Sequence, residues 1–109
     1  LDMSKFIEAS ADMDDECSRL TISGEIDLNT IEVLEPKLEE MLKEDKDILI
    51  DMENVKFIDS TGLGTLVKLY KDQKARNRKV TIINTRVNVR KIFKITCMEE
   101  MFNLGGENS

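Results

Sequence analysis

The sequence predicts an α/β domain in which helices cover a mixed β-sheet of four to five strands, with the elements in the order ββαβαβα. Three observations lead to this fold class. The chain has 109 residues, which fits one domain and leaves little room for a second. Segments with strand-like patterns alternate with segments in which apolar residues recur at helical spacing. Helical crossovers between strands imply parallel neighbours after an initial hairpin.

The first two strands are expected over residues 5–10 and 19–26, with a polar turn over residues 12–16 between them. In the second segment apolar and polar residues alternate, which marks a strand that is buried on one face. The apolar residues of that face are Leu20, Ile22 and Ile26. We expect the two strands to form an antiparallel hairpin.

A helix is expected next, and Pro36 leaves its start open. Asn29 and Glu32 have the spacing of a capping box, which places the start near Asn29. Proline lacks the N–H group and clashes with the preceding turn. Either the helix kinks at Pro36, or residues 30–34 form a short turn and the main helix starts near Pro36. The apolar residues at helical spacing that would face the core are Leu34, Leu38, Met41 and Leu42.

The second half of the chain continues the alternation of strand and helix. Residues 47–52 form a short apolar run between polar flanks, which is typical of a central strand covered on both faces. The other elements expected in chain order are a helix over residues 61–76, a strand over 80–84, a helix over 86–95, a short turn with an edge strand between 98 and 104, and a frayed tail over 105–109.

Composition excludes several functions. The chain has no histidine, so it cannot build a Ser-His-Asp or Cys-His site, and the usual zinc-ligand sets are missing. Cys17 and Cys97 are far apart without a CxxC pattern, which favours reduced thiols in a cytoplasmic protein. No stretch approaches the roughly 20 apolar residues of a membrane span, and no secretory signal is visible. We therefore expect no metal, no cofactor and no membrane partner.

Charge is unevenly distributed along the chain. Residues 1–54 hold 17 acidic and 5 basic side chains, whereas residues 55–109 hold 5 acidic and 11 basic ones. The net charge of −6 argues against direct binding to nucleic acid. We interpret the charges as solvated outer faces of helices, while the alternative is a polarised surface that steers a charged partner.

Residues 57–67 carry the most information about function, because a strand ends and a helix begins there. Asp59 or Ser60 would cap the helix by accepting a free backbone N–H. Gly62 and Gly64 lie in the first two turns, where glycine costs up to ~1 kcal/mol relative to alanine. They either allow tight packing against a strand or keep a low surface where a partner docks on Ser60. The spacing does not match a dinucleotide fingerprint or a P-loop, although a helix N-terminus suits a phosphate.

A resemblance to a known family sharpens this interpretation. Residues 59–64, Asp-Ser-Thr-Gly-Leu-Gly, resemble the D-S-x-G-L-G signature of anti-sigma factor antagonists, which are stand-alone STAS domains. Residues 24–27, Gly-Glu-Ile-Asp, resemble the family's G-[ED]-[LIV]-D, and residues 88–93 resemble its third helix. These matches span nearly the whole chain, so residues 1–109 are identified as a single STAS-type domain.

The resemblance implies a phosphorylation switch at Ser60. In the family this serine is phosphorylated by the anti-sigma factor, which is itself an ATP-dependent serine kinase. The unmodified antagonist binds the kinase with its ATP or ADP and frees the sigma factor, and a serine phosphatase restores the phosphorylated form. The chain would then be a substrate and ligand rather than an enzyme. When free, it is expected to be a monomer.

The partner-binding residues expected from this resemblance are Asp27, Asp59, Ser60, Thr61, Gly62, Leu63 and Gly64. Asp59 would orient the hydroxyl or contact the kinase, and Thr61 would make a contact or act as a second acceptor. For Asp27, a contact with the partner and a structural role at the turn stay equally open. The alternative functions are a STAS scaffold or sensor module of another bacterial signalling complex and, less favoured, a small enzyme or nucleotide-binding protein.

Overall fold

A four-stranded sheet organises the fold, and the computed structural model describes it over residues 6–104. The elements in chain order are β1 (Ile7–Met13), β2 (Cys17–Ile26), α1 (Ile31–Leu42), β3 (Asp47–Ile58), α2 (Ser60–Lys74), β4 (Val80–Ile83) and α3 (Val87–Ile95). This sequence of elements confirms the predicted order ββαβαβα. The expected frayed tail and the start of the expected first strand at Lys5 lie outside the described residues.

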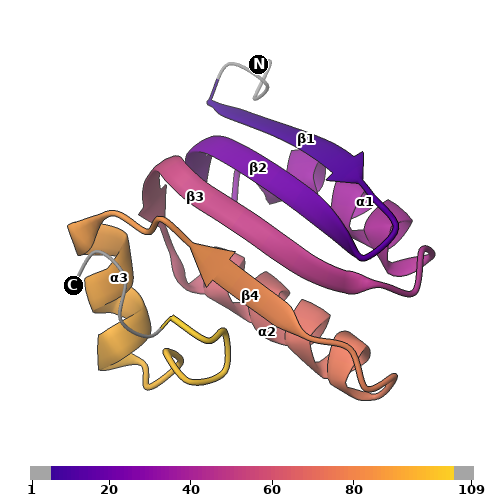
Figure 1. The fold of residues 1–109 in the computed structure, drawn as a ribbon. Helices are drawn as coiled ribbons and strands as arrows, with labels where there is room; N and C mark the ends of the chain where they lie inside the picture. The colour runs from indigo at the N-terminus through magenta and orange to yellow at the C-terminus, as the bar shows by residue number, and fades with distance from the viewer. Residues whose placement is uncertain (1–5, 105–109) are drawn as a thin grey trace.

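The strands lie in the spatial order β1-β2-β3-β4 (Figure 1). β1 pairs with β2 in antiparallel orientation, which confirms the predicted hairpin. β2 with β3 and β3 with β4 pair in parallel, as the helical crossovers imply. Because β2, β3 and β4 run in the same direction, their carboxyl ends meet at one edge of the sheet. This edge carries the candidate functional site.

The core lies between the sheet and the helices behind it. α1 and α2 lie on the same face of the sheet (Figure 1), and the Arg76 guanidinium of the segment after α2 donates to the Leu42 carbonyl of α1. The strand residues buried in this core are Ile7, Leu20, Ile22, Ile26, Ile48, Ile50, Met52, Val55, Ile58, Val80 and Ile82. Burial of each large apolar side chain stabilises the fold by about 1.5–3 kcal/mol.

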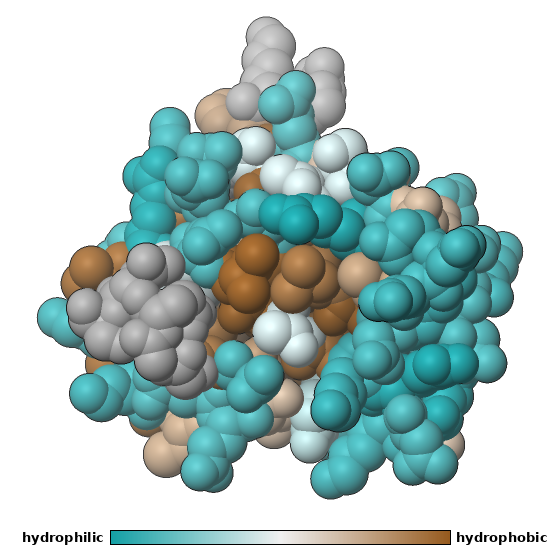
Figure 2. Space-filling model, in the orientation of Figure 1, coloured by the Kyte–Doolittle hydropathy of each residue, from teal (hydrophilic) through white to brown (hydrophobic). Residues whose placement is uncertain are grey.

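The prediction that the central strand is covered on both faces is wrong. Leu49 and Asp51 of β3 alternate with the buried Ile48 and Ile50, and they are only half-buried. The reason is geometric: β2, β3 and β4 follow one another across the sheet, so two right-handed crossovers place both helices on one face. Figure 2 shows the opposite face, where apolar surface in the centre is framed by hydrophilic side chains.

The start of α1 also differs from the prediction. Thr30, not Asn29, occupies the N-cap position, and its side chain makes no capping hydrogen bond. The helix runs without a break through Pro36, so a start at Pro36 is excluded. Pro36 is exposed, and water can therefore satisfy the carbonyl group that its missing N–H leaves free.

The segment after α3 forms turns rather than the expected edge strand. It still contacts the edge of the sheet, because the Ile82 N–H of β4 donates to the Phe102 carbonyl over 3.1 Å. The Phe102 ring is fully buried and packs edge-on against Tyr70 and Phe93, with ring centroids 5.9 and 5.7 Å apart. An aromatic cluster therefore anchors this segment, and a continuous strand is not needed.

Other element boundaries differ by a few residues. β1 continues to Met13, so the expected turn over residues 12–16 is shorter, and β3 continues six residues beyond the expected end at Met52. Cys17 and Cys97 are both free thiols. Within residues 6–104, no helix combines the length and the apolar character needed to span a bilayer.

A polar network on the open face of the sheet joins β2 and β3 to Asn84, the residue that follows β4. The Asp51 carboxylate accepts from Arg19 Nη2 over 3.1 Å, from Asn84 Nδ2 over 3.2 Å and from the Glu53 N–H over 3.0 Å. Burial of Asp51 raises the pKa of its carboxyl. The hydrogen bonds together with the Arg19 charge lower it by more, so the pKa lies below its ordinary value.

Replacing Asp51 by asparagine is expected to destabilise the fold in a pH-dependent way. A carboxyl group whose pKa is lowered by folding stabilises the protein above its unfolded pKa, and this stabilisation is lost as pH falls through the folded pKa. We expect Asp51→Asn to lower the free energy of unfolding by about 1–2 kcal/mol at pH 7. The difference from the parent should shrink towards pH 3. Urea unfolding at several pH values measures this, with Asp15→Asn at an exposed position as the control. A difference that does not change with pH would contradict the assigned role of Asp51.

Candidate functional site

Two acidic residues lie side by side at the carboxyl edge of the sheet. Ile26, the last residue of β2, pairs with Ile58, the last residue of β3. The next residues, Asp27 and Asp59, therefore leave the sheet at the same edge. The Asp59 N–H donates to the Ile26 carbonyl over 3.0 Å, which extends the pairing by one step. The structure places both predicted aspartates at one rim.

Asp59 caps α2 and also holds the neighbouring turn. Its backbone is extended (φ −106°, ψ −174°), and its Oδ1 accepts from the Gly62 N–H over 2.9 Å. Its Oδ2 accepts from the Leu28 N–H over 3.1 Å. Of the two capping residues considered from the sequence, Asp59 therefore fills the role. The bonds of this carboxylate go to the two backbone groups, not to the hydroxyl of Ser60.

The turn between β2 and α1 is fixed by its own side chains. Asp27 Oδ1 accepts from the N–H groups of Asn29 and Thr30 over 2.9 and 3.0 Å. The Thr30 hydroxyl accepts from the Asp27 N–H over 3.0 Å and donates to the Glu25 carbonyl over 2.7 Å. Asp27 thus has a structural role at the turn.

Leu28 is a site residue that sequence reasoning missed. Its side chain is 70% exposed, although its backbone is held by Asp59. A single exposed apolar side chain is common on protein surfaces, but the hydrogen bond to Asp59 fixes this one next to the residue that precedes Ser60. The sequence feature that could have indicated this residue is a leucine between Asp27 and Asn29, two polar residues of a loop.

Ser60 is exposed and forms the first residue of α2. Thr61 follows and is half-buried. The N–H groups of a first helical turn have no partner within the helix, and the helix dipole adds positive potential there. The Ser60 hydroxyl therefore lies in water at a helix end that tolerates added negative charge. This arrangement suits a hydroxyl group that accepts a phosphoryl group.

The two glycines of α2 have different environments. Gly62 is buried, and a Cβ atom there would lie 2.7 Å from Ile26 Cγ2 and from Ile58 Cγ1. Gly64 is exposed, and a Cβ atom there would meet nothing within 4 Å. Gly62 therefore serves tight packing, and Leu63 beside it is also buried at 7% exposure. Among Gly62, Leu63 and Gly64, only Gly64 is exposed.

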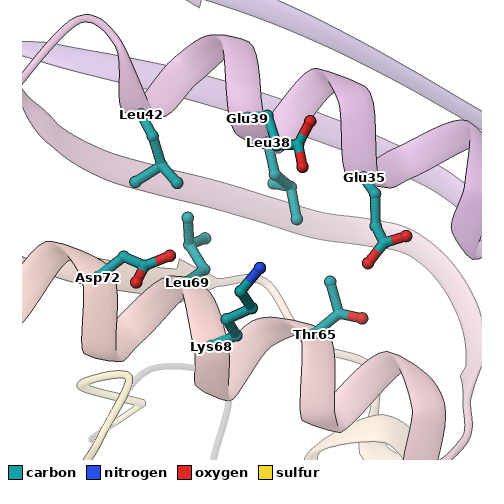
Figure 3. A pocket seen from close by; sticks show the side chains of 8 residues that line it. All are labelled: Glu35, Leu38, Glu39, Leu42, Thr65, Lys68, Leu69 and Asp72. Atoms are coloured by element: carbon teal, nitrogen blue, oxygen red, sulfur yellow. The ribbon is translucent and has the colours of Figure 1, made fainter.

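A shallow groove between α1 and α2 begins at Thr65, the residue after Gly64. Figure 3 shows the residues that line it: Glu35, Leu38, Glu39, Leu42, Thr65, Lys68, Leu69 and Asp72. The Lys68 side chain reaches from α2 towards α1, while the three carboxylates make the groove acidic overall. Lys74, at the end of α2, does not line this groove, and its Nζ lies 5.6 Å from the centre of the Tyr70 ring.

The site is built without metal ligands. Over residues 6–104, no three cysteine, aspartate or glutamate side chains gather in a way that could hold a metal ion. The chemistry available at the rim comes from one exposed hydroxyl, two hydrogen-bonded carboxylates and free backbone N–H groups.

Comparisons with known proteins identify the family and match the fold. The family model of the STAS domain matches residues 8–107. An anti-sigma-B factor antagonist of Staphylococcus aureus (strain NCTC 8325 / PS 47) is 29% identical over 91 residues, which are 83% of this chain and 84% of that protein.

Solved structures show the same fold. The crystal structure of an anti-sigma factor antagonist from Mycobacterium paratuberculosis has a TM-score of 0.81 and 24% identity, and covers 90% of this chain and 84% of that one. The Bacillus cell fate determinant SpoIIAA in its phosphorylated form has a TM-score of 0.67 and 19% identity, with coverage of 92% and 93%. At these identities the likeness extends to the fold alone.

The two glycines provide a matched pair of substitutions. Gly62→Ala forces a methyl group against Ile26 and Ile58, and we expect it to lower the free energy of unfolding by about 1–3 kcal/mol. Gly64→Ala meets no neighbour and removes a flexible residue from a helix, so it should raise stability by up to ~1 kcal/mol. Urea unfolding of both variants measures the difference. Equal effects of the two substitutions would contradict the packing role of Gly62.

Substitutions of Asp59 separate its two hydrogen bonds. Asp59→Ala loses both and should cost about 0.5–2 kcal/mol, as for other lost N-caps. Asp59→Asn keeps one oxygen for the Gly62 N–H, but its amide group cannot also accept from Leu28. We therefore expect Asp59→Asn to keep more of the stability while the Leu28 amide exchanges faster with solvent. Amide exchange measured by NMR tests this, and unchanged protection of Leu28 in both variants would refute the link.

Proposed function

This chain belongs to the STAS domain family, and on that premise we propose that it is an anti-sigma factor antagonist whose binding is switched off by phosphorylation of Ser60. The observation that carries the proposal is the placement of Ser60: an exposed hydroxyl at the start of α2, between the rigid Leu28 turn and the open surface at Gly64. The name of the similar S. aureus protein, an anti-sigma-B factor antagonist, supports it.

In the proposed cycle the chain is a substrate and a ligand, not an enzyme. Its unmodified form binds an anti-sigma factor that is a serine kinase, and the sigma factor is released. The kinase then transfers the γ-phosphoryl group of ATP to Ser60 Oγ, ADP leaves, and the hydroxyl proton passes to a base or to water. A serine phosphatase hydrolyses the phosphate ester and restores binding. ATP and these partners place the cycle in the cytoplasm.

The proposed docking surface combines apolar and polar contacts at the rim. Leu28 supplies an exposed apolar side chain, while Ser60, Thr61 and Gly64 give a low surface beside it. Asp27 and Asp59 border this surface with negative charge. Gly62 and Leu63 support it from the core and act through packing rather than contact.

Charge explains how the switch would reduce binding. A phosphate on Ser60 adds about −1.5 to −2 charge beside the carboxylates of Asp27 and Asp59. An interface that buries this dianion without pairing it loses several kcal/mol. Each 1.4 kcal/mol corresponds to about tenfold in affinity, so no rearrangement of the fold is required.

The fold itself should tolerate the phosphate. Free N–H groups and the dipole at a helix start stabilise nearby negative charge by roughly 0.3–1 kcal/mol. The hydrogen bonds of Asp59 to Gly62 and Leu28 lie below the exposed hydroxyl and do not involve it. The modified and unmodified proteins should therefore have the same backbone structure.

The test combines phosphorylation with binding. The protein is mixed with its candidate anti-sigma factor and ATP, and the modified residue is mapped by mass spectrometry. We expect a single phosphate on Ser60, which is lost in Ser60→Ala and retained in Thr61→Ala. Ser60→Glu should bind the kinase at least about tenfold more weakly than Ser60→Ala, with an unchanged circular dichroism spectrum.

Two outcomes would contradict the proposal. A kinase that is active on another substrate but leaves Ser60 unmodified would favour a scaffold or sensor module. Equal binding of Ser60→Glu and Ser60→Ala would show that charge at this position does not control docking.

A further inference from the structure

The two edge strands of the sheet, β4 and β1, differ in how far other residues cover their outer backbone groups. β4 has four residues, and the segment around Phe102 covers part of its outer edge through the Ile82 N–H. β1 has seven residues and lies at the margin of the molecule (Figure 1). Among residues 6–104, no group hydrogen-bonds to the outer edge of β1.

The hydrogen-bond pattern of the hairpin identifies the free groups. The Glu25 N–H donates to the Phe6 carbonyl over 2.9 Å, and at the other end the Asp14 N–H donates to the Cys17 carbonyl over 3.1 Å. Antiparallel pairs alternate, so residues 8, 10 and 12 also bond to β2. The backbone groups that point outward, away from β2, are therefore those of Ile7, Ala9, Ala11 and Met13.

This edge lacks several of the usual protections against added strands. Natural proteins shield exposed edges with proline, with charged side chains and lysine above all, with bulges or with very short strands. β1 has no proline and no lysine, its seven pairs with β2 run without a register shift, and its only charged side chains are the acidic Glu8 and Asp12. Ala9 and Ala11 leave the backbone accessible. Phe6, just before the strand, and Met13, its last residue, are apolar residues whose exposed fractions are 45% and 44%.

The charge on β1 selects the kind of partner. Glu8 and Asp12 are exposed on one face of the strand, and the hairpin turn adds Asp14, Asp15 and Glu16. Antiparallel pairing of two copies about Ser10 would place Glu8 opposite Asp12 twice, and like charges in such pairs are destabilising. A strand with lysine or arginine at alternate positions would instead pair opposite charges.

We propose that the outer edge of β1 binds an extended basic segment of a partner protein, which adds to the sheet as a fifth strand beside β1. Backbone hydrogen bonds to Ile7, Ala9, Ala11 and Met13 supply affinity, and the carboxylates of Glu8 and Asp12 supply selectivity. β2 separates this edge from β3 and α2, so the basic segment docks apart from the surface around Ser60. The proposal does not depend on the phosphorylation switch.

The test uses the full chain with two synthetic peptides, one alternating lysine with valine and one alternating glutamate with valine. Binding is followed by NMR. We expect the basic peptide to bind at least ~10-fold more tightly than the acidic one. It should slow amide exchange at Ile7, Ala9, Ala11 and Met13 and leave Ser10 unchanged.

Two variants separate edge pairing from general charge attraction. In Ala11→Pro the lost N–H points outward, so the pairing with β2 survives while the docking edge loses a donor. This variant should bind the basic peptide at least ~10-fold more weakly. The double variant Glu8→Lys with Asp12→Lys keeps every backbone group and should prefer the acidic peptide.

Several results would overturn the proposal. These are binding of neither peptide, protection that maps to the rim around Ser60, equal affinity of the Ala11→Pro variant, and dimers of the unmodified chain joined at β1. Amide spectra of both variants establish that they are folded. A folded Ala11→Pro variant with full affinity would show that the peptide uses charge alone.

Discussion

The parallel pairing of β2 with β3, which ends at Ile26 and Ile58, is the constraint on which the site depends. It brings Asp27 and Asp59 to the same rim, and the Asp59 N–H continues the pairing to the Ile26 carbonyl. The start of α2 then has to lie directly over these two isoleucines. Only a residue without a side chain fits there, and Gly62 meets that demand. The exposed Ser60 therefore lies two residues before a tightly packed contact between α2 and the sheet.

Asp59 shows how one carboxylate serves both folding and recognition. Its oxygens hold the Gly62 and Leu28 N–H groups, and so join the helix to the turn that presents an exposed leucine. The same negative charge lies next to a hydroxyl that becomes strongly anionic on phosphorylation. A neutral cap would hold the helix almost as well but would add less repulsion to a phosphorylated interface. An acidic cap therefore fits a site that must remain folded in two charge states.

The sequence was sufficient for the order of elements, the hairpin and the parallel neighbours. Predictions from the sequence failed for features that depend on three-dimensional packing. Asn29 has the spacing of a capping box, but the conformation of the turn puts Thr30 at the N-cap position, and the Asp27 carboxylate accepts from the N–H groups of Asn29 and Thr30. The apolar run that ends at Met52 predicts a shorter strand than β3. The strand continues past the polar residues Glu53 and Asn54, with an irregular register against β2. Gly62 and Gly64 look alike in sequence, and their different roles follow from the side of α2 that meets the sheet.

The aromatic cluster behind β4 gives the molecule an optical property. The chain has one tyrosine, no tryptophan and four weakly emitting phenylalanines, so its strongest near-ultraviolet fluorescence comes from Tyr70. That ring contacts Phe102 at its edge and has the Lys74 ammonium group 5.6 Å from its centre. Detachment of the segment around Phe102 would change the surroundings of this ring. The chain thus contains an intrinsic reporter of the order of its last described turn.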